Sequence, residues 1–204
     1  MNENDPLLGA STLVVNQKMK IIEVHNEYAV LNGAGEKVGA VRQTGQNALK
    51  KIVRVVSSLD QFFTHTLEVV DGSGAVRLKL VRPRKFLKSK LLVSDGHDRP
   101  IGRIVQQNAI GKIRFNLEDA TGSVLGTLNG QNWRAWNFSV ADASRTEIAT
   151  ISKTWEGLAK TLFTTADNYR VERTVIPAEP LNSLVVASAL AIDTALKQDS
   201  RGLS

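Results

Sequence analysis

Turn-forming tetrapeptides recur along the chain at nearly constant spacing, and this repeat limits the fold more than any other feature. Their leading aspartates lie 24, 24 and 23 residues apart. The tetrapeptides are Asp71-Gly72-Ser73-Gly74, Asp95-Gly96-His97-Asp98, Asp119-Ala120-Thr121-Gly122 and Asp142-Ala143-Ser144-Arg145, preceded by the similar Asn32-Gly33-Ala34-Gly35. Asp and Asn side chains accept hydrogen bonds from the backbone of turns, and Gly adopts positive φ. Each tetrapeptide lies between two apolar-rich segments, so each predicts a β-hairpin.

The segments between the turns alternate apolar and polar residues. Ile113, Phe115 and Leu117 fall on every second position, and residues 76–80 and 136–140 follow the same rule. A period of two predicts strands with one buried face, as in an antiparallel meander. About ten or more such strands in series must curl or close, because open sheets rarely grow so wide.

A small residue stands four positions after the end of most of these turns. The residues concerned are Gly39, Gly102, Gly126 and Ala149. The hairpin after Gly74 departs from the pattern, with Leu78 at the equivalent position. Small residues inside strands indicate bends or a close approach of neighbouring backbones.

Residues 181–197 predict one strong helix, which begins after Pro180. Between Leu184 and Ile192 the only polar residue is Ser188, and a helix that is apolar on every side is buried or lies in a membrane. From Leu181 to Leu196 it would span roughly 24 Å, whereas a bilayer core needs about 30 Å. We therefore expect a core helix wrapped by the sheet, since each element then buries the other's apolar surface.

Two further segments are less regular. Residues 46–59 fit a helix or a strand, and residues 155–165 predict a short helix.

The composition of the 204 residues is that of one globular domain, with 42% hydrophobic and 23% charged residues. Cysteine is absent, which excludes disulfides and thiolate metal sites. The first residues carry early acids and no long apolar core, so they do not resemble a signal peptide. We expect a cytoplasmic protein. The net charge of +6 favours anionic partners, although solubility alone also explains it.

The densest cluster of basic residues is the candidate binding site. It consists of Arg82, Arg84, Lys85, Lys88 and Lys90. Such a cluster attracts anionic membrane lipid or a phosphoinositide headgroup, at about 1 kcal/mol per basic residue. The alternative interpretation is a solvated outer strand face that discourages pairing between sheet edges.

No catalytic arrangement is apparent. His25, His65 and His97 are isolated from one another and from any nucleophile motif, and no nucleotide-binding glycine loop is present. We expect a protein that is not an enzyme. Trp133 and Trp136 flank Arg134 and could stack on nucleic-acid bases, but no nucleic-acid-binding motif accompanies them, so we expect no nucleic-acid partner.

A resemblance to a known family is carried by residues 82–89, Phe115–Gly126, Asn132–Trp136, Phe163–Tyr169 and the final helix. These stretches resemble phospholipid scramblase-related and LURP-one-related proteins of the tubby C-terminal-like superfamily. The resemblance implies a closed, all-β barrel of about twelve antiparallel strands around a buried C-terminal helix. It covers the chain after about Leu13. We expect a flexible tail over residues 1–12, one barrel domain over 13–197 and a second tail over 198–204.

The resemblance also implies membrane-linked functions. The first expectation is a non-enzymatic protein that binds anionic phospholipid or phosphoinositide headgroups, peripheral at the inner face of the plasma membrane. Movement of phospholipids between leaflets and a scaffold role without lipid are the alternatives. Scramblases carry an acidic calcium segment before the last helix. Here Thr165 and Ile176 replace two of its ligands, leaving Asp167, Asn168 and Glu172. A calcium ion needs six or more oxygens, so we expect no cofactor, and no lipid on cysteine either.

Overall fold

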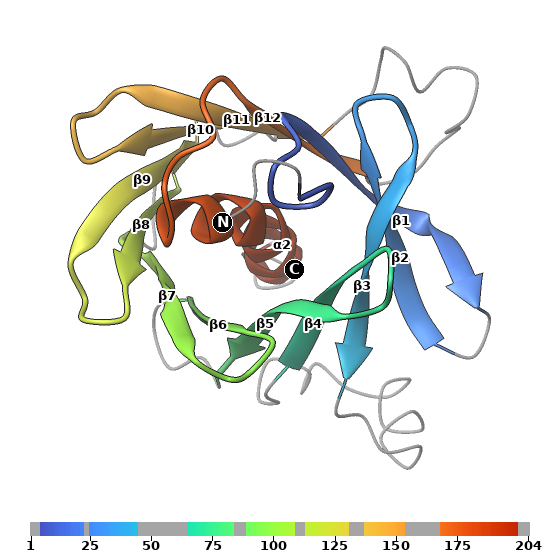
Figure 1. Ribbon diagram of the computed structural model, residues 1–204. Helices are drawn as coiled ribbons and strands as arrows, with labels where there is room; N and C mark the ends of the chain where they lie inside the picture. Colours follow the sequence, from blue (N-terminus) through green and yellow to red (C-terminus); the bar gives the residue numbers. More distant parts are fainter. Residues whose placement is uncertain are drawn as a thin grey trace.

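The computed structural model describes residues 5–22, 25–44, 65–83, 89–108, 113–130, 137–153 and 168–199. Within these ranges, twelve antiparallel strands form a closed barrel around one long helix, as expected (Figure 1). The strands are β1 (Thr12–Ile22), β2 (His25–Asn32), β3 (Lys37–Thr44), β4 (His65–Asp71), β5 (Val76–Arg82), β6 (Lys90–Asp95), β7 (Pro100–Gln106), β8 (Arg114–Asp119), β9 (Val124–Gly130), β10 (Asn137–Asp142), β11 (Glu147–Lys153) and β12 (Asn168–Arg173), and the helix is α2 (Leu181–Asp199).

Every strand pairs with its neighbours in sequence, and β1 pairs with β12 to close the cylinder. The closing register runs from Thr12 opposite Glu172 to Asn16 opposite Asn168. Closure leaves no free edge along the described strands, which removes the unpaired backbone groups that make open sheets prone to aggregation.

The predicted hairpins form as their sequences indicate. In the hairpin between β4 and β5, Oδ1 of Asp71 accepts hydrogen bonds from the backbone N–H groups of Ser73 (2.9 Å) and Ala75 (3.1 Å). The fourth residue of each such turn has positive φ: Gly35, Gly74, Asp98, Gly122 and Arg145. The register of each hairpin shifts beside its turn. This combination describes a type I turn followed by a bulge.

The residue at the positive-φ position offers a test of local strain. The left-handed conformation costs a residue with a Cβ about 1–2 kcal/mol. Arg145→Gly should therefore raise the free energy of unfolding by about 1 kcal/mol. Gly74→Ala should lower it by about the same amount. A Cβ at Gly74 would meet no atom within 4 Å, so backbone strain is the only new cost there. Urea unfolding of the two variants beside the parent protein measures both, and equal midpoints for all three would contradict the turn assignment.

The small residues after the turns allow close backbone contact, as predicted. A Cβ at Gly39 would lie 2.3 Å from the carbonyl oxygen of Val70, and one at Gly102 would lie 2.2 Å from that of Glu118. Because glycine has no side chain, these positions also leave room inside the barrel. The nearest side-chain atom to a Cβ at Gly126 would be Cδ1 of Leu181, at 3.4 Å.

Helix α2 fills the interior, which confirms the core-helix prediction. Leu184, Val185, Ala187 and Ile192 are each 0% exposed, and Figure 1 shows the helix inside the ring of strands. Its buried hydroxyl is satisfied, since Ser188 donates to the carbonyl oxygen of Leu184 at 2.7 Å. Among the helices in the described ranges, none combines the length and apolarity needed to cross a membrane.

The N-terminal residues differ from the flexible tail expected over residues 1–12. Leu7 is 0% exposed and Leu8 is 4% exposed, and both belong to the core. Gly39 leaves space for Leu7, since an added Cβ would lie 3.3 Å from Cδ1 of Leu7. The tail expected over 198–204, the ambiguous segment 46–59 and the short helix expected over 155–165 lie largely or wholly outside the described residues.

Candidate functional site

The up-and-down chain path gives the barrel two different ends. The tight hairpins at 33–36, 72–75, 96–99, 120–123 and 143–146 lie at one end, together with residues 174–180 that lead into α2. We call this the turn end. At the other end, the strands finish and restart on either side of a second set of connections. These connections are residues 23–24, 45–64, 83–89, 107–113, 131–136 and 154–167. We call this the connection end.

Charge is distributed unequally between the two ends. The connections at the connection end contain nine Lys or Arg and four Asp or Glu. The segments that join elements at the turn end contain two Lys or Arg and three Asp or Glu. The excess positive charge of the chain is therefore carried by segments anchored at the connection end, which include Arg84, Lys85 and Lys88.

Aromatic residues follow the same asymmetry. All three tryptophans of the chain, Trp133, Trp136 and Trp155, occur in connections of this end. Four of the six phenylalanines do so as well: Phe62, Phe63, Phe86 and Phe163. The sequence alone showed the basic cluster, and the order of the strands adds that all of these connections join strands at the same end of the barrel.

The structure describes two members of the predicted basic cluster, Arg82 and Lys90. Along β5, Leu78, Leu80 and Arg82 are buried, so Arg82 shares the inward phase and is only 6% exposed. This burial conflicts with the expectation that Arg82 contacts a headgroup, because a strand directs every second side chain to the same face. Lys90, at the start of β6, is exposed. Arg84, Lys85 and Lys88 lie outside the described residues.

The connection that carries the basic residues is tied to the barrel at its end. The backbone N–H of Ser89 donates to Oε1 of Gln106 at 3.1 Å, and the N–H of Gln106 donates to the carbonyl oxygen of Ser89 at 2.9 Å. Both residues are buried. These bonds fix where the segment re-enters the barrel, immediately before Lys90.

Several charges of the barrel wall are paired across neighbouring strands. Arg42 and Glu68 stand opposite each other on β3 and β4, with Nε and Oε2 2.9 Å apart. Arg103 and Glu118 do the same on β7 and β8, at 2.5 Å. Such partly buried cross-strand pairs contribute roughly 0.2–1 kcal/mol each to stability. Each pair neutralises the positive charge of its own arginine.

The other candidate residues are dispersed. His25 and His65 lie at the starts of β2 and β4, and His97 is exposed in a hairpin turn, as expected for a solvated residue. In the segment that matches the scramblase calcium region, Glu172 lies on β12 and pairs with Arg170, with Oε1 and Nη2 2.6 Å apart. Among the described residues, no group of three or more His, Cys, Asp or Glu side chains is arranged to hold a metal ion. Trp133, Arg134, Trp136 and Asp167 lie outside the described residues.

Comparison with known proteins identifies the family. The chain is 25% identical over 182 residues to a phospholipid scramblase family protein of Schizosaccharomyces pombe, covering 80% of this chain and 46% of that protein. It is 22% identical over 233 residues to the altered inheritance rate of mitochondria protein 25 of Saccharomyces cerevisiae, covering 92% of this chain and 70% of that protein. The chain thus spans about half the length of the first relative.

No solved structure matches the chain significantly. The family model described as Scramblase matches residues 2–196. This match extends over nearly the whole chain and agrees with the closed barrel around a buried helix. The chain belongs to the scramblase family, within the tubby-like superfamily.

Proposed function

We propose that this scramblase-family protein binds anionic phospholipid or phosphoinositide headgroups at a membrane surface, and that the connection end faces the bilayer. The observation that supports the proposal best is the charge asymmetry of the barrel ends. Nine basic residues in the connections of one end, against two in the segments of the other, favour one orientation toward an anionic surface.

The magnitude of this attraction is sufficient for peripheral binding. Basic residues near an anionic membrane contribute about 1 kcal/mol each. Arg84, Lys85, Lys88 and Lys90 alone would then contribute about 4 kcal/mol, before any contact with an individual headgroup. Arg82 is left out of this set because it is buried.

The aromatic residues support the same orientation. Tryptophan is enriched where membrane meets water, because its ring is mostly apolar while its N–H can still donate to water or headgroups. The segments that join strands at this end contain every tryptophan of the chain. Basic and aromatic residues in the same set of connections are the composition expected of a surface that lies at the level of lipid headgroups.

Reversing charge at the connection end should abolish membrane binding. We expect the parent protein to sediment with vesicles of phosphatidylcholine and phosphatidylserine. The triple variant Arg84→Glu, Lys85→Glu, Lys88→Glu should bind at least about a hundredfold more weakly, since it loses about 3 kcal/mol of attraction and adds repulsion. Sedimentation at several lipid concentrations measures the partition coefficient, and a phosphoinositide-containing series distinguishes general charge from headgroup recognition.

A matched variant at the turn end separates orientation from net charge. The triple variant Lys37→Glu, Arg99→Glu, Arg145→Glu changes the net charge equally, and all three residues are exposed. It should retain most of the binding. Equal losses in both variants, or no loss in the first, would contradict the proposed orientation.

A dye-reduction assay in proteoliposomes, with and without calcium, tests the second candidate, phospholipid scrambling, which the family match favours. Binding without scrambling would support the headgroup-binding function alone.

A further inference from the structure

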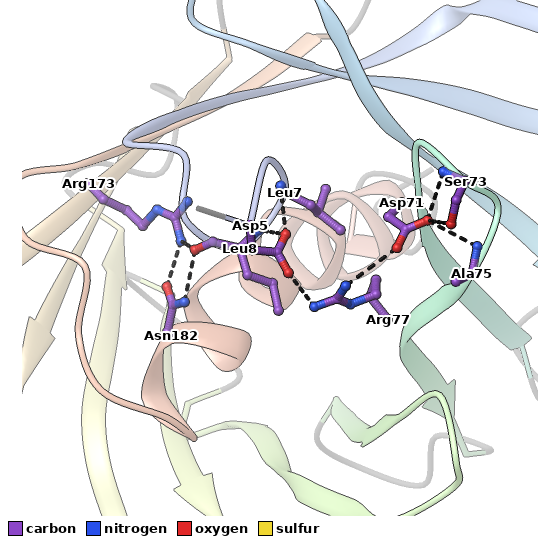
Figure 2. A network of polar contacts seen from close by, with 9 residues as sticks. All are labelled: Asp5, Leu7, Leu8, Asp71, Ser73, Ala75, Arg77, Arg173 and Asn182. Carbon is purple, nitrogen blue, oxygen red and sulfur yellow. Dashed lines mark hydrogen bonds and ion pairs between the residues drawn. The ribbon is translucent and has the colours of Figure 1, made fainter. Parts of the chain in front are cut away.

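Residues 5–10 precede β1, belong to no strand and lie across the mouth of the barrel at the turn end. We call them the N-terminal strap. Figure 2 shows how the strap is held between Arg77 of β5 on one side and Arg173 of β12 with Asn182 of α2 on the other. The cylinder itself closes without the strap, because the pairing of β1 with β12 begins at Thr12.

The acidic residue of the strap is recognised by an arginine. Oδ2 of Asp5 accepts a hydrogen bond from Nη2 of Arg77, and Asp5 is 8% exposed. Its other oxygen, Oδ1, accepts the backbone N–H groups of Leu7 at 2.9 Å and Leu8 at 3.0 Å. Arg77 is itself oriented by Asp71, whose Oδ2 lies 3.4 Å from Nη1. The Asp5 carboxylate therefore binds Arg77 through one oxygen and stabilises a turn of the strap through the other.

The two leucines of the strap occupy apolar space prepared by the barrel. Leu7 and Leu8 are almost completely buried. Gly39 provides the room, since a Cβ at that position would come within 3.3 Å of Cδ1 of Leu7. Adjacent leucines anchored in this way, beside a paired acid, have the form of a short recognition motif seated in its site.

The carbonyl groups of the strap are also bound by side chains. The carbonyl oxygen of Leu8 accepts from Nη1 of Arg173 at 2.8 Å and from Nδ2 of Asn182 at 3.0 Å. The carbonyl oxygen of Ala10 accepts from Nη2 of Arg173. Arg173 is 5% exposed, and burial lowers its pKa to about 10, partly offset by the negative charge of Glu179. At neutral pH it remains a charged donor fixed at the mouth.

We propose that the turn-end mouth is a peptide-binding site which the strap occupies in cis. Its ligand class is a peptide with an acidic residue followed two and three positions later by leucines. Arg77 receives the acid, the space beside Gly39 receives the first leucine, and Arg173 with Asn182 receive backbone carbonyls. A partner protein that carries such a segment competes with the strap. This site is at the opposite end from the proposed lipid-binding surface and does not depend on it.

The test uses the full chain with a weakened strap. In the variant Leu7→Ser, Leu8→Ser, a fluorescein-labelled synthetic peptide of residues 2–11 should bind saturably. Its binding to the parent protein should be at least tenfold weaker, because a tethered strap competes at a high effective concentration. The same peptide with both leucines changed to serine should bind the variant at least tenfold more weakly. Fluorescence anisotropy measures all three affinities.

Further substitutions assign the site. Adding Arg77→Gln to the strap variant should weaken peptide binding about tenfold, because a charge-assisted bond is lost. Adding Arg99→Gln, an exposed arginine at the same end, should leave it unchanged. A folded strap variant that does not bind the peptide, or that binds the serine peptide equally well, overturns the proposal.

A second measurement covers the case in which the strap variant does not fold. The chain has no cysteine, so Asn2→Cys can carry a single environment-sensitive dye in an otherwise unchanged protein. Millimolar unlabelled peptide should displace the strap and shift the dye emission, whereas the serine peptide should not. Identical spectra with both peptides overturn the proposal.

Discussion

Gly102→Ala is expected to destabilise the protein by about 3 kcal/mol, the upper part of the range for overpacking. The added Cβ would lie 2.2 Å from the carbonyl oxygen of Glu118 and 3.2 Å from Cα of Asp119. Both are backbone atoms of β8, so the strand pair must separate to make room. Since domains are stable by only about 5–15 kcal/mol, one methyl group would remove a large share of the stability. Urea unfolding followed by circular dichroism measures the change.

Gly72→Ala is the matched control for this substitution. Gly72 lies in a hairpin turn, and a Cβ added there would meet only the carbonyl oxygen of Val38, at 3.9 Å. The cost there should stay within about 0.5 kcal/mol. Similar midpoints for the two alanine variants would show that β7 and β8 are not as close as described.

Leu184→Asp is expected to have the largest effect of any substitution considered, and to leave the protein unfolded at 25 °C. Removing a buried leucine side chain costs about 2–5 kcal/mol, and placing an unpaired polar or charged group in the same space adds several more. Leu184 is 0% exposed at the centre of the barrel. Leu184→Ala should show only the cost of removing the leucine side chain. The difference between the two variants then measures the cost of the buried charge.

Val175→Asp provides the comparison for a change from apolar to acidic. Val175 is 58% exposed in the segment before α2, and its substitution should change the free energy of unfolding by less than about 0.5 kcal/mol. Thermal unfolding in detergent-free buffer is the measurement. A stable, cooperatively folded Leu184→Asp protein would mean that α2 is not enclosed by the strands.

The local features of the barrel could be predicted from the sequence because they depend on neighbouring residues. Asp71 and Gly74 identify a turn by the backbone bonds and the positive φ that they support. Gly102 marks a close approach because few other residues fit there. The apolar surface of α2 required enclosure, and because the helix is too short for a bilayer core, the hairpins were the expected surroundings. Each prediction needed no more than a turn, a strand or one helix.

Two features differ from the expectations, one for a local reason and one because it depends on contacts between distant residues. Arg82 was grouped with its basic neighbours, but the phase set by Leu78 and Leu80 directs it inward. Leu7 and Leu8 are too short an apolar segment to predict burial by themselves. The site of the strap is assembled from β3, β5, β12 and α2, and Arg173 lies more than 160 residues from Leu8 along the chain. The sequence did mark β5 as different from the other strands. There Arg77 and Leu78 stand where the other hairpins have a small residue, and Arg77 is the residue that binds Asp5.

With the proposed function, the net positive connections of one end and the slightly negative segments of the other would give the molecule an electric dipole along the barrel axis. Facing an anionic bilayer, such a body experiences a torque as well as an attraction, so it rotates before it touches. This steering acts over about one Debye length, roughly 8 Å at physiological salt. Arrival with the basic end inward leaves the strap mouth pointing to the aqueous phase. A docked molecule would thus present that mouth to proteins in solution while its opposite end is occupied by lipid.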